Sequence, residues 1–288
     1  MKLRTLILSI FLSCPLMLAA QGLDTAKIDE VMGRSGQKTG EVYRLGFPRT
    51  DLHVSVGSLE IKPGLALGSW AAFAGNESDA TVMGDLVLLE NELTPVMKKL
   101  RIAGFEITAV HNHLLNETPR IIYMHYMGHG KSSELAKSLR TALAESKTPL
   151  DKPAAPTAEP PAFVKIVEDT LGTKGRFGGG VLSFGIPRSG AITDHGMTLT
   201  GAQGVAEAIN FQEAGTGKVA TTGDFVLTAE EVNPVISALE VHDIEVTALH
   251  SHMLTEQPRL FFIHFWAVGN AESVVGGIKA ALSHVAVK

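Results

Sequence analysis

Two stretches of the chain carry the same histidine, glutamate and arginine side chains at the same spacing. The first runs His111-Asn-His-Leu-Leu-Asn-Glu-Thr-Pro-Arg120 and is followed by His125. The second runs His250-Ser-His-Met-Leu-Thr-Glu-Gln-Pro-Arg259 and is followed by His264. Neutral imidazole and carboxylate groups are ligands for zinc, copper(II), manganese and iron. The spacing therefore predicts a site for a divalent metal, and the residues leave open which one.

The expected geometry of each motif is a strand, a turn and a returning strand. Alternation along a strand places His111 and His113 on one face, about 7 Å apart along the backbone, so both imidazoles can reach one ion. With a turn near Glu117, the returning strand brings His125 within cross-strand reach of His111. Glu117 at the hairpin tip completes the first expected ligand set. The second set consists of His250, His252, Glu256 and His264.

The repetition extends beyond the motif and is an internal tandem duplication. The numbering offset between the two copies, 250 − 111 = 139, also relates Gly84-Asp85 to Gly223-Asp224. Between 84–130 and 223–269, 19 of 47 positions are identical, and the histidines, glutamate and arginine of the motif are among them. A shared core by itself retains apolar residues, so a retained polar set indicates a bound ligand or metal.

Three other uses of these side chains are compatible with the sequence. The histidines could be hydrogen-bonded parts of a structural hairpin, with Arg120 paired to Glu117 or to a helix end. Glu117 or Glu256 could act as general base to a metal-bound water in a hydrolase. Arg120 and Arg259 could hold a carboxylate or phosphate in a non-catalytic module that binds an anionic cell-envelope ligand. No single residue identifies a reaction, so the sequence leaves open whether the protein is an enzyme.

The elements around each motif follow from hydrophobic periodicity. In the first copy we expect a strand, a helix, two hairpin strands and a closing helix at 84–89, 90–102, 106–115, 120–127 and 132–145. Short helices at 24–32 and 163–171 are expected to open the two copies. Asp85 and Asp224, each directly after a glycine, are interpreted as turn residues. Each copy thus ends strand, helix, strand, strand, helix, which is an α+β architecture.

These patterns divide the chain into a signal peptide at 1–22, a first repeat unit at 24–146, a linker at 147–162 and a second repeat unit at 163–288. Five prolines make the linker extended and semi-rigid. We expect the two units to pack with approximate twofold symmetry.

The segment 1–22 has the basic start, short apolar run and small residues of a secretory signal peptide, so the mature chain is expected to begin near Gln21. The apolar run, about 14 residues, is too short for a transmembrane span. Cys14 is the only cysteine, which excludes disulfides and leaves lipid anchoring there as an alternative. We expect the protein in the periplasm or outside the cell.

The charge of the mature chain argues against polyanionic partners. Removing the two basic residues of the signal peptide from 25 leaves 23 against 30 acidic residues, a net charge of −7. No cluster of lysine and arginine stands out, which argues against nucleic acid and anionic lipid. The expected partner is a metal ion or a small anionic ligand.

The doubled His-x-His-x-x-x-Glu-x-Pro-Arg-x-x-x-x-His motif, with the Gly-Asp strand before it and the exported N-terminus, resembles the LppY/LpqO family of bacterial exported proteins and predicted lipoproteins. The resemblance covers nearly the whole mature chain, in both copies. It implies an exported location and a domain of unknown function, and it assigns no reaction. The residues around Cys14 depart from the cleavage site that the lipoprotein name implies.

Overall fold

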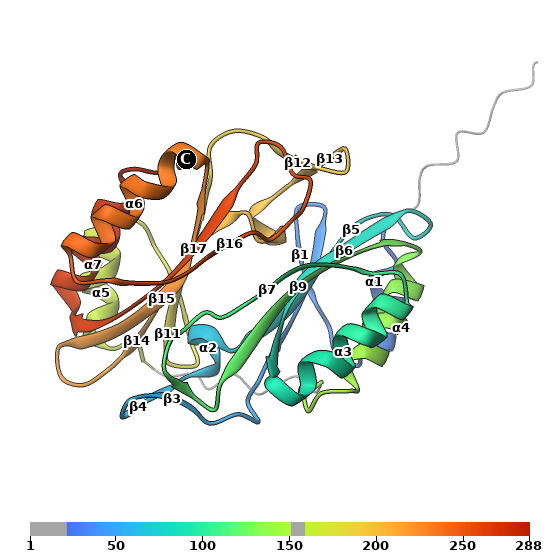
Figure 1. Ribbon diagram of the computed structural model, residues 1–288, viewed down its shortest axis with the longest axis horizontal. Helices are drawn as coiled ribbons and strands as arrows, with labels where there is room; N and C mark the ends of the chain where they lie inside the picture. The colour runs from blue at the N-terminus through green and yellow to red at the C-terminus, as the bar shows by residue number, and fades with distance from the viewer. Residues whose placement is uncertain (1–21, 151–158) are drawn as a thin grey trace, which may run out of the picture.

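A computed structural model describes residues 22–150 and 159–288, and in this part of the chain two similar units lie side by side (Figure 1). Each unit has a six-stranded antiparallel sheet with its long helices on the outer face, so the two sheets lie between the two groups of long helices. The short helix at Pro63–Ala66 is the exception, because it lies between the units against strands of the second sheet. The predicted signal peptide up to residue 21, with Cys14, and linker residues 151–158 lie outside the described residues. None of the described helices has the length and hydropathy needed to cross a membrane.

The first unit contains four helices and nine strands in the described residues. The helices are α1 (Thr25–Met32), α2 (Pro63–Ala66), α3 (Glu90–Ile102) and α4 (Ser132–Leu143). The strands are β1 (Gln37–Thr39), β2 (Val42–Pro48), β3 (Val54–Val56), β4 (Leu59–Ile61), β5 (Gly68–Gly75), β6 (Ala80–Leu89), β7 (Glu106–His111), β8 (Glu117–Thr118) and β9 (Ile121–Gly130). The main sheet has the order β1-β2-β5-β6-β9-β7, and a small sheet has the order β4-β3-β8.

The second unit repeats this arrangement. Its helices are α5 (Ala162–Leu171), α6 (Ala229–Val241) and α7 (Ala271–Leu282), with a short 3-10 helix at Gly201–Gln203. Its strands are β10 (Arg176–Gly178), β11 (Val181–Pro187), β12 (Ile192–Asp194), β13 (Met197–Leu199), β14 (Ala206–Glu213), β15 (Lys218–Leu227), β16 (Glu245–His250) and β17 (Phe261–Asn270). The sheet order β10-β11-β14-β15-β17-β16 matches that of the first unit. The predicted duplication and the α+β class are therefore confirmed.

The period of two in the central strands separates a helix-facing side from a side that faces the other unit. In β9, Met124 and Tyr126 belong to the core beneath the helices, together with Val96 of α3 and Leu139 of α4. The alternate residues, His125 among them, point away from the helices and toward the second unit. Burial of the apolar side thus fixes which residues each sheet presents to its neighbour.

A buried ion pair joins the strand region of the first unit to α3. Arg49 is fully buried, and its Nη1 donates to Oε2 of Glu92 at 2.8 Å. Glu92 also accepts hydrogen bonds from the backbone N–H groups of Leu89 and Lys147. Burial by itself raises the pKa of Glu92, but these hydrogen bonds outweigh it and leave the pKa below its ordinary value. The ionised form of Glu92 therefore stabilises the fold.

Glu92→Gln is expected to lower the free energy of unfolding by about 2 kcal/mol at neutral pH, because it removes one of the two carboxylates that pair with buried Arg49 and leaves only Asp51. The pKa of Glu92 is lower in the folded state, so this stability is present above the unfolded pKa and is lost as pH falls through the folded pKa. Urea unfolding at pH 7 and at pH 3 measures the difference. Glu30→Gln, which alters an exposed pair with Lys27, is the control. Equal stability of Glu92→Gln and wild type at pH 7 would contradict the prediction.

Candidate metal centre

The six histidines of the two motifs meet where the two sheets face each other. Those of the first copy are His111 at the end of β7, His113 in the following loop and His125 in β9. Those of the second copy are His250 at the end of β16, His252 in the following loop and His264 in β17. The ring centroids of His111 and His250 lie 3.7 Å apart. The histidines of the two predicted ligand sets therefore form one cluster across the interface.

The cluster has approximate twofold symmetry. The rings of His113 and His264 lie 3.8 Å apart, and so do the rings of His125 and His252. The numbering offset between the copies exchanges these two pairs, because it relates His113 to His252 and His125 to His264. Equal distances in the exchanged pairs are what a twofold axis through the cluster requires. The expected twofold packing of the copies is therefore seen at the histidines.

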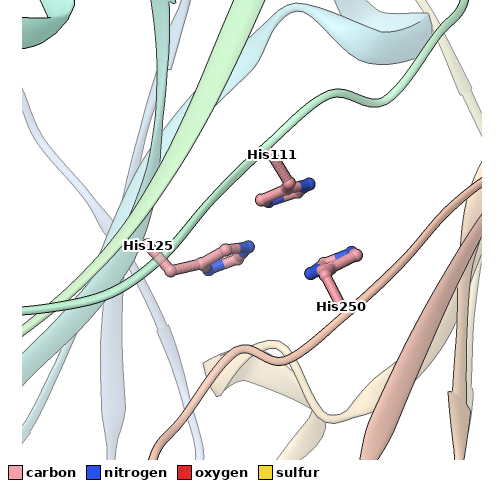
Figure 2. A group of neighbouring side chains, drawn as sticks. All are labelled: His111, His125 and His250. Carbon is pink, nitrogen blue, oxygen red and sulfur yellow. The ribbon is translucent and has the colours of Figure 1, made fainter.

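Three groups of side chains each place their ligand atoms within 4.8 Å of one another. The groups are His111, His125 and His250; His111, His113 and His264; and Asp224, His250 and His252. The first two groups draw on both copies. Figure 2 shows the first group, with the imidazoles of His111, His125 and His250 arranged around a common space between the two chain segments. The arrangement can supply three nitrogen ligands to one ion.

The hydrogen bonds of the rings fix their protonation in the form that metals bind. Nδ1 of His264 lies 2.7 Å from the carbonyl oxygen of Gly223, and Nδ1 of His252 lies 3.2 Å from that of Gly204. A carbonyl only accepts, so in these rings Nδ1 carries the proton and Nε2 keeps its lone pair. His111 has the same type of contact, from Nδ1 to the carbonyl of Asn112.

All six Nε2 atoms are buried. Those of His113 and His252 lie beside the carboxylates of Asp85 and Asp224, and the other four have no hydrogen-bond partner among the described residues. Leaving one buried polar atom unsatisfied costs about 1–3 kcal/mol, so four in one place require a common explanation. Nε2 lone pairs directed into a shared space are suited to coordinate a metal ion. The residues present therefore fit a metal.

Burial also holds the imidazoles in the neutral, ligand form. It lowers the pKa of His113, His125 and His264 well below the ordinary value, and neighbouring histidines lower it further. The pKa of His111 is lowered by the same burial. At neutral pH these rings are uncharged, so a metal ion does not have to displace protons from them.

Two aspartates that were expected in turns belong to the cluster. Asp85 and Asp224 lie inside β6 and β15, because these strands begin several residues before the Gly-Asp pair. Oδ2 of Asp85 lies 3.5 Å from Nε2 of His113, and Oδ2 of Asp224 lies 2.9 Å from Nε2 of His252. Burial raises the pKa of Asp224, and His252 opposes this effect. The interpretation of Asp85 and Asp224 as turn residues was therefore wrong. The sequence signal that could have identified them as site residues is an acidic residue within an apolar strand in both copies.

A carboxylate oxygen 2.9 Å from an imidazole nitrogen needs a positive charge between them, supplied by a proton on the ring or by a shared cation. In the contact between Asp224 and His252, the Nδ1 proton of His252 is already directed at the Gly204 carbonyl. A cation shared by the nitrogen and the oxygen supplies this charge, and a metal ion can serve as that cation. The aspartates thus complete a mixed nitrogen and oxygen donor set.

The two motif glutamates bind backbone groups instead of the cluster. Oε1 of Glu117 accepts from the N–H of Ile121 at 3.2 Å. Glu256 is fully buried and accepts from the N–H of Leu260 at 2.9 Å and from Arg259 at 3.2 Å. Each carboxylate spans a turn that contains a cis X-Pro bond. The structure therefore does not bring Glu117 or Glu256 to the histidines, because each turn directs the carboxylate to an N–H four residues later.

The two motif arginines also lie away from the histidines. The side chain of Arg120 is 67% exposed, and its Nε is 3.9 Å from Oε1 of Glu90. Nη1 of Arg259 contacts the carbonyl oxygens of Met253 and Leu254 as well as Glu256. The repeated arginine thus lies at the turn in both copies. Arg259 binds groups of the turn itself, whereas Arg120 is exposed beside Glu90.

The protein thus consists of two similar α+β units that share a cluster of histidines and aspartates. The sequence profile of one family matches both units. This chain belongs to that family, which is described as Domain of Unknown Function (DUF1259) and matches residues 26–145 and again 165–284. No curated protein matches the chain.

Two solved structures align with most of the chain at low similarity. One is the trimeric bacterial microcompartment shell protein PduB, with 11% identity, 87% of this chain and 89% of that chain covered, and a TM-score of 0.22. The other is EtuB from Clostridium kluyveri, with 12% identity, 86% and 90% covered, and a TM-score of 0.20. These TM-scores do not establish a shared fold.

Proposed function

We propose that this protein binds a divalent transition metal in one cluster shared by its two copies. The observation that carries the proposal is the convergence of imidazole nitrogens from both copies within 4.8 Å of one another. The buried Nε2 atoms without protein partners support it. Several imidazoles with a carboxylate suit zinc, copper(II), manganese or iron, whereas softer ions prefer thiolates. Glu117 and Glu256 are not needed as ligands in this proposal.

Metal analysis of the full chain, purified without chelator and without a histidine tag, tests the proposal. After dialysis against zinc, copper or manganese and removal of excess metal, we expect the protein to retain metal in a fixed ratio to protein. Removal with a strong chelator should lower the unfolding temperature, because an ion that binds only the folded state stabilises it. Protein that stays free of zinc, copper and manganese after this treatment would overturn the proposal.

We also propose that the protein is exported, as its N-terminal sequence and its resemblance to the LppY/LpqO family suggest. The intact mass of protein recovered from its native host is expected to correspond to a chain that begins near Gln21. A small-residue cleavage site after the apolar run supports this start. Recovery of a chain whose first residue is a lipid-modified Cys14 would contradict it, and so would recovery of the uncleaved chain.

A further inference from the structure

A cavity of about 640 Å³ lies between the two sheets, and part of the histidine cluster lines it. Its volume falls within the range of small-molecule sites, about 300–1,000 Å³. Its wall includes both aspartates and four of the histidines, namely Asp85, Asp224, His113, His125, His252 and His264. The rest of the wall includes two arginines, Arg44 and Arg176.

Arg44 is held in one orientation at the cavity wall. Its guanidinium lies 3.9 Å from the ring centroid of Trp70, and its Nη1 donates to the carbonyl oxygen of Ala202 in the other copy at 2.5 Å. Stacking on the indole and the single hydrogen bond fix the plane of the group. A planar guanidinium fixed in this way has further N–H donors available for two parallel hydrogen bonds to a carboxylate or phosphate.

Arg176 adds a second positive charge to the same cavity from β10 of the second copy. Within residues 22–150 and 159–288, neither Arg44 nor the exposed Arg176 has a carboxylate oxygen within 4.0 Å. Burial lowers the pKa of Arg44, and the negative charge of Asp85 on the same wall opposes this effect. Arg49 and Arg188, by contrast, are in direct contact with Glu92 and Glu231. Two arginines of one cavity without a carboxylate in direct contact have guanidinium N–H donors available for an anion.

The cavity wall differs between the copies, although the histidines do not. Register places Trp70 opposite Asp85 in the first sheet and Ala208 opposite Asp224 in the second, so these two wall positions are equivalent. The numbering offset between the copies relates the other wall positions. The three equivalent pairs are Arg44 and Ser183, Trp70 and Ala208, and Gln37 and Arg176. Such an uneven wall distinguishes the two ends of an asymmetric ligand.

A second observation points to a polar ligand in this cavity. Thr222 lines it and is 2% exposed, and its Oγ1 has no hydrogen-bond partner among the described residues. Its equivalent in the first copy is Met83, which carries no hydroxyl. A buried hydroxyl without a partner is unfavourable unless a bound group completes its hydrogen bonds. Ser183 and Asn210 line the same wall and offer further polar groups.

We propose that the cavity between the sheets binds a small organic oxyanion, a carboxylate or a phosphate, whose charged group is held by Arg44 and Arg176. The remainder of the ligand extends past Thr222 toward the histidine cluster. The charged group is held by residues outside the histidine and aspartate donor set, so the inference goes beyond metal binding and does not require it. The carboxylate and phosphate sources share the same recognition by arginine.

Calorimetric titration of the full chain with malonate and, separately, with inorganic phosphate at low ionic strength tests the proposal. We expect at least one of the two anions to bind wild-type protein. Arg44→Gln and Arg176→Gln should each weaken binding by at least about tenfold, because each removes charge-assisted hydrogen bonds. The double variant should show no binding. Arg44→Lys, which keeps the charge but loses the planar fork, should restore only part of the affinity.

Lys137→Gln is the matched control, because it removes one positive charge from the exposed face of α4, where Lys137 pairs with Glu134. It should bind the anion as wild type does. Unfolding curves confirm that the variants are folded; should Arg44→Gln fail to fold, Arg176→Gln on an exposed strand still decides the question. Failure of wild type to bind either anion would overturn the inference, as would wild-type affinity in the double variant. Metal content after dialysis against zinc, copper or manganese is a separate readout on the same preparation, so protein that binds the anion but retains no metal would overturn the proposed metal function alone.

Discussion

Replacing His111 and His250 together with alanine is expected to abolish metal binding, although each copy keeps two of its three motif histidines. Every group of ligand atoms that the structure brings together contains His111, His250 or both. The two rings lie 3.7 Å apart across the interface, so the pair is central to the shared cluster. Loss of residues that only orient a ligand costs about 10–100-fold in metal affinity, so loss of two ligands should cost more than that.

The measurement is competition for zinc between the protein and a chelator of known affinity, combined with elemental analysis after desalting. His129→Ala is the control: its side chain is 68% exposed and its Nε2 lies 2.8 Å from Asp79, outside the cluster. Far-UV circular dichroism verifies that both variants fold. Metal content equal to that of wild type in the double variant would contradict the shared cluster.

Gly84→Ala and Gly223→Ala are expected to destabilise the protein strongly. A Cβ at Gly84 would lie 2.1 Å from the carbonyl oxygen of Trp70, and one at Gly223 would lie 1.9 Å from that of Ala208. Both contacts are with the backbone of a paired strand, which cannot move without disrupting the sheet. Overpacking typically costs about 1–3 kcal/mol and occasionally more, and contacts this short place the expected loss at about 3 kcal/mol or above.

Urea unfolding of the two variants measures this loss, with Gly46→Ala and Gly185→Ala as controls. These controls also place alanine in strands of the two main sheets, but no atom lies within 4 Å of the added Cβ. They should unfold at urea concentrations close to that of wild type. Because Gly84 and Gly223 directly precede the cluster aspartates, a partly folded variant should also lose metal. Wild-type stability of Gly84→Ala would show that the strands separate more easily than the structure indicates.

The sequence by itself determined the duplication, the class of the fold and the order of the elements around the histidines. The constant offset between the copies can be read directly from the chain, and hydrophobic periodicity is a local property of each segment. The helix expected at 90–102 is α3, Glu90–Ile102. The hairpin strand expected at 106–115 is shorter and ends at His111, so His113 lies in the loop beyond it. Its ring is nevertheless brought to the cluster, 5.2 Å from that of His111.

The tertiary structure decided which side chains form the site. Strand periodicity predicts that His111 and His113 lie on the same face of a strand. It does not predict which other part of the protein packs against that face. The contact between His111 and His250 joins equivalent residues of the two copies, far apart in the chain, and depends on how two sheets pack. Asp85 belongs to the cluster because its position in β6 places its carboxylate beside His113. Glu117 does not belong to it, because its carboxylate accepts a hydrogen bond from the N–H of Ile121.

The cavity arginines were beyond the reach of the sequence for a different reason. Comparison of the two copies draws attention to residues that both have retained, whereas Arg44 and Arg176 each occur in one copy only. They line the same cavity because β2 of the first copy and β10 and β11 of the second all contribute residues to its wall. Local pattern specifies elements and their buried sides, but contacts between distant segments are set by the packing of whole surfaces, which no short stretch of sequence encodes.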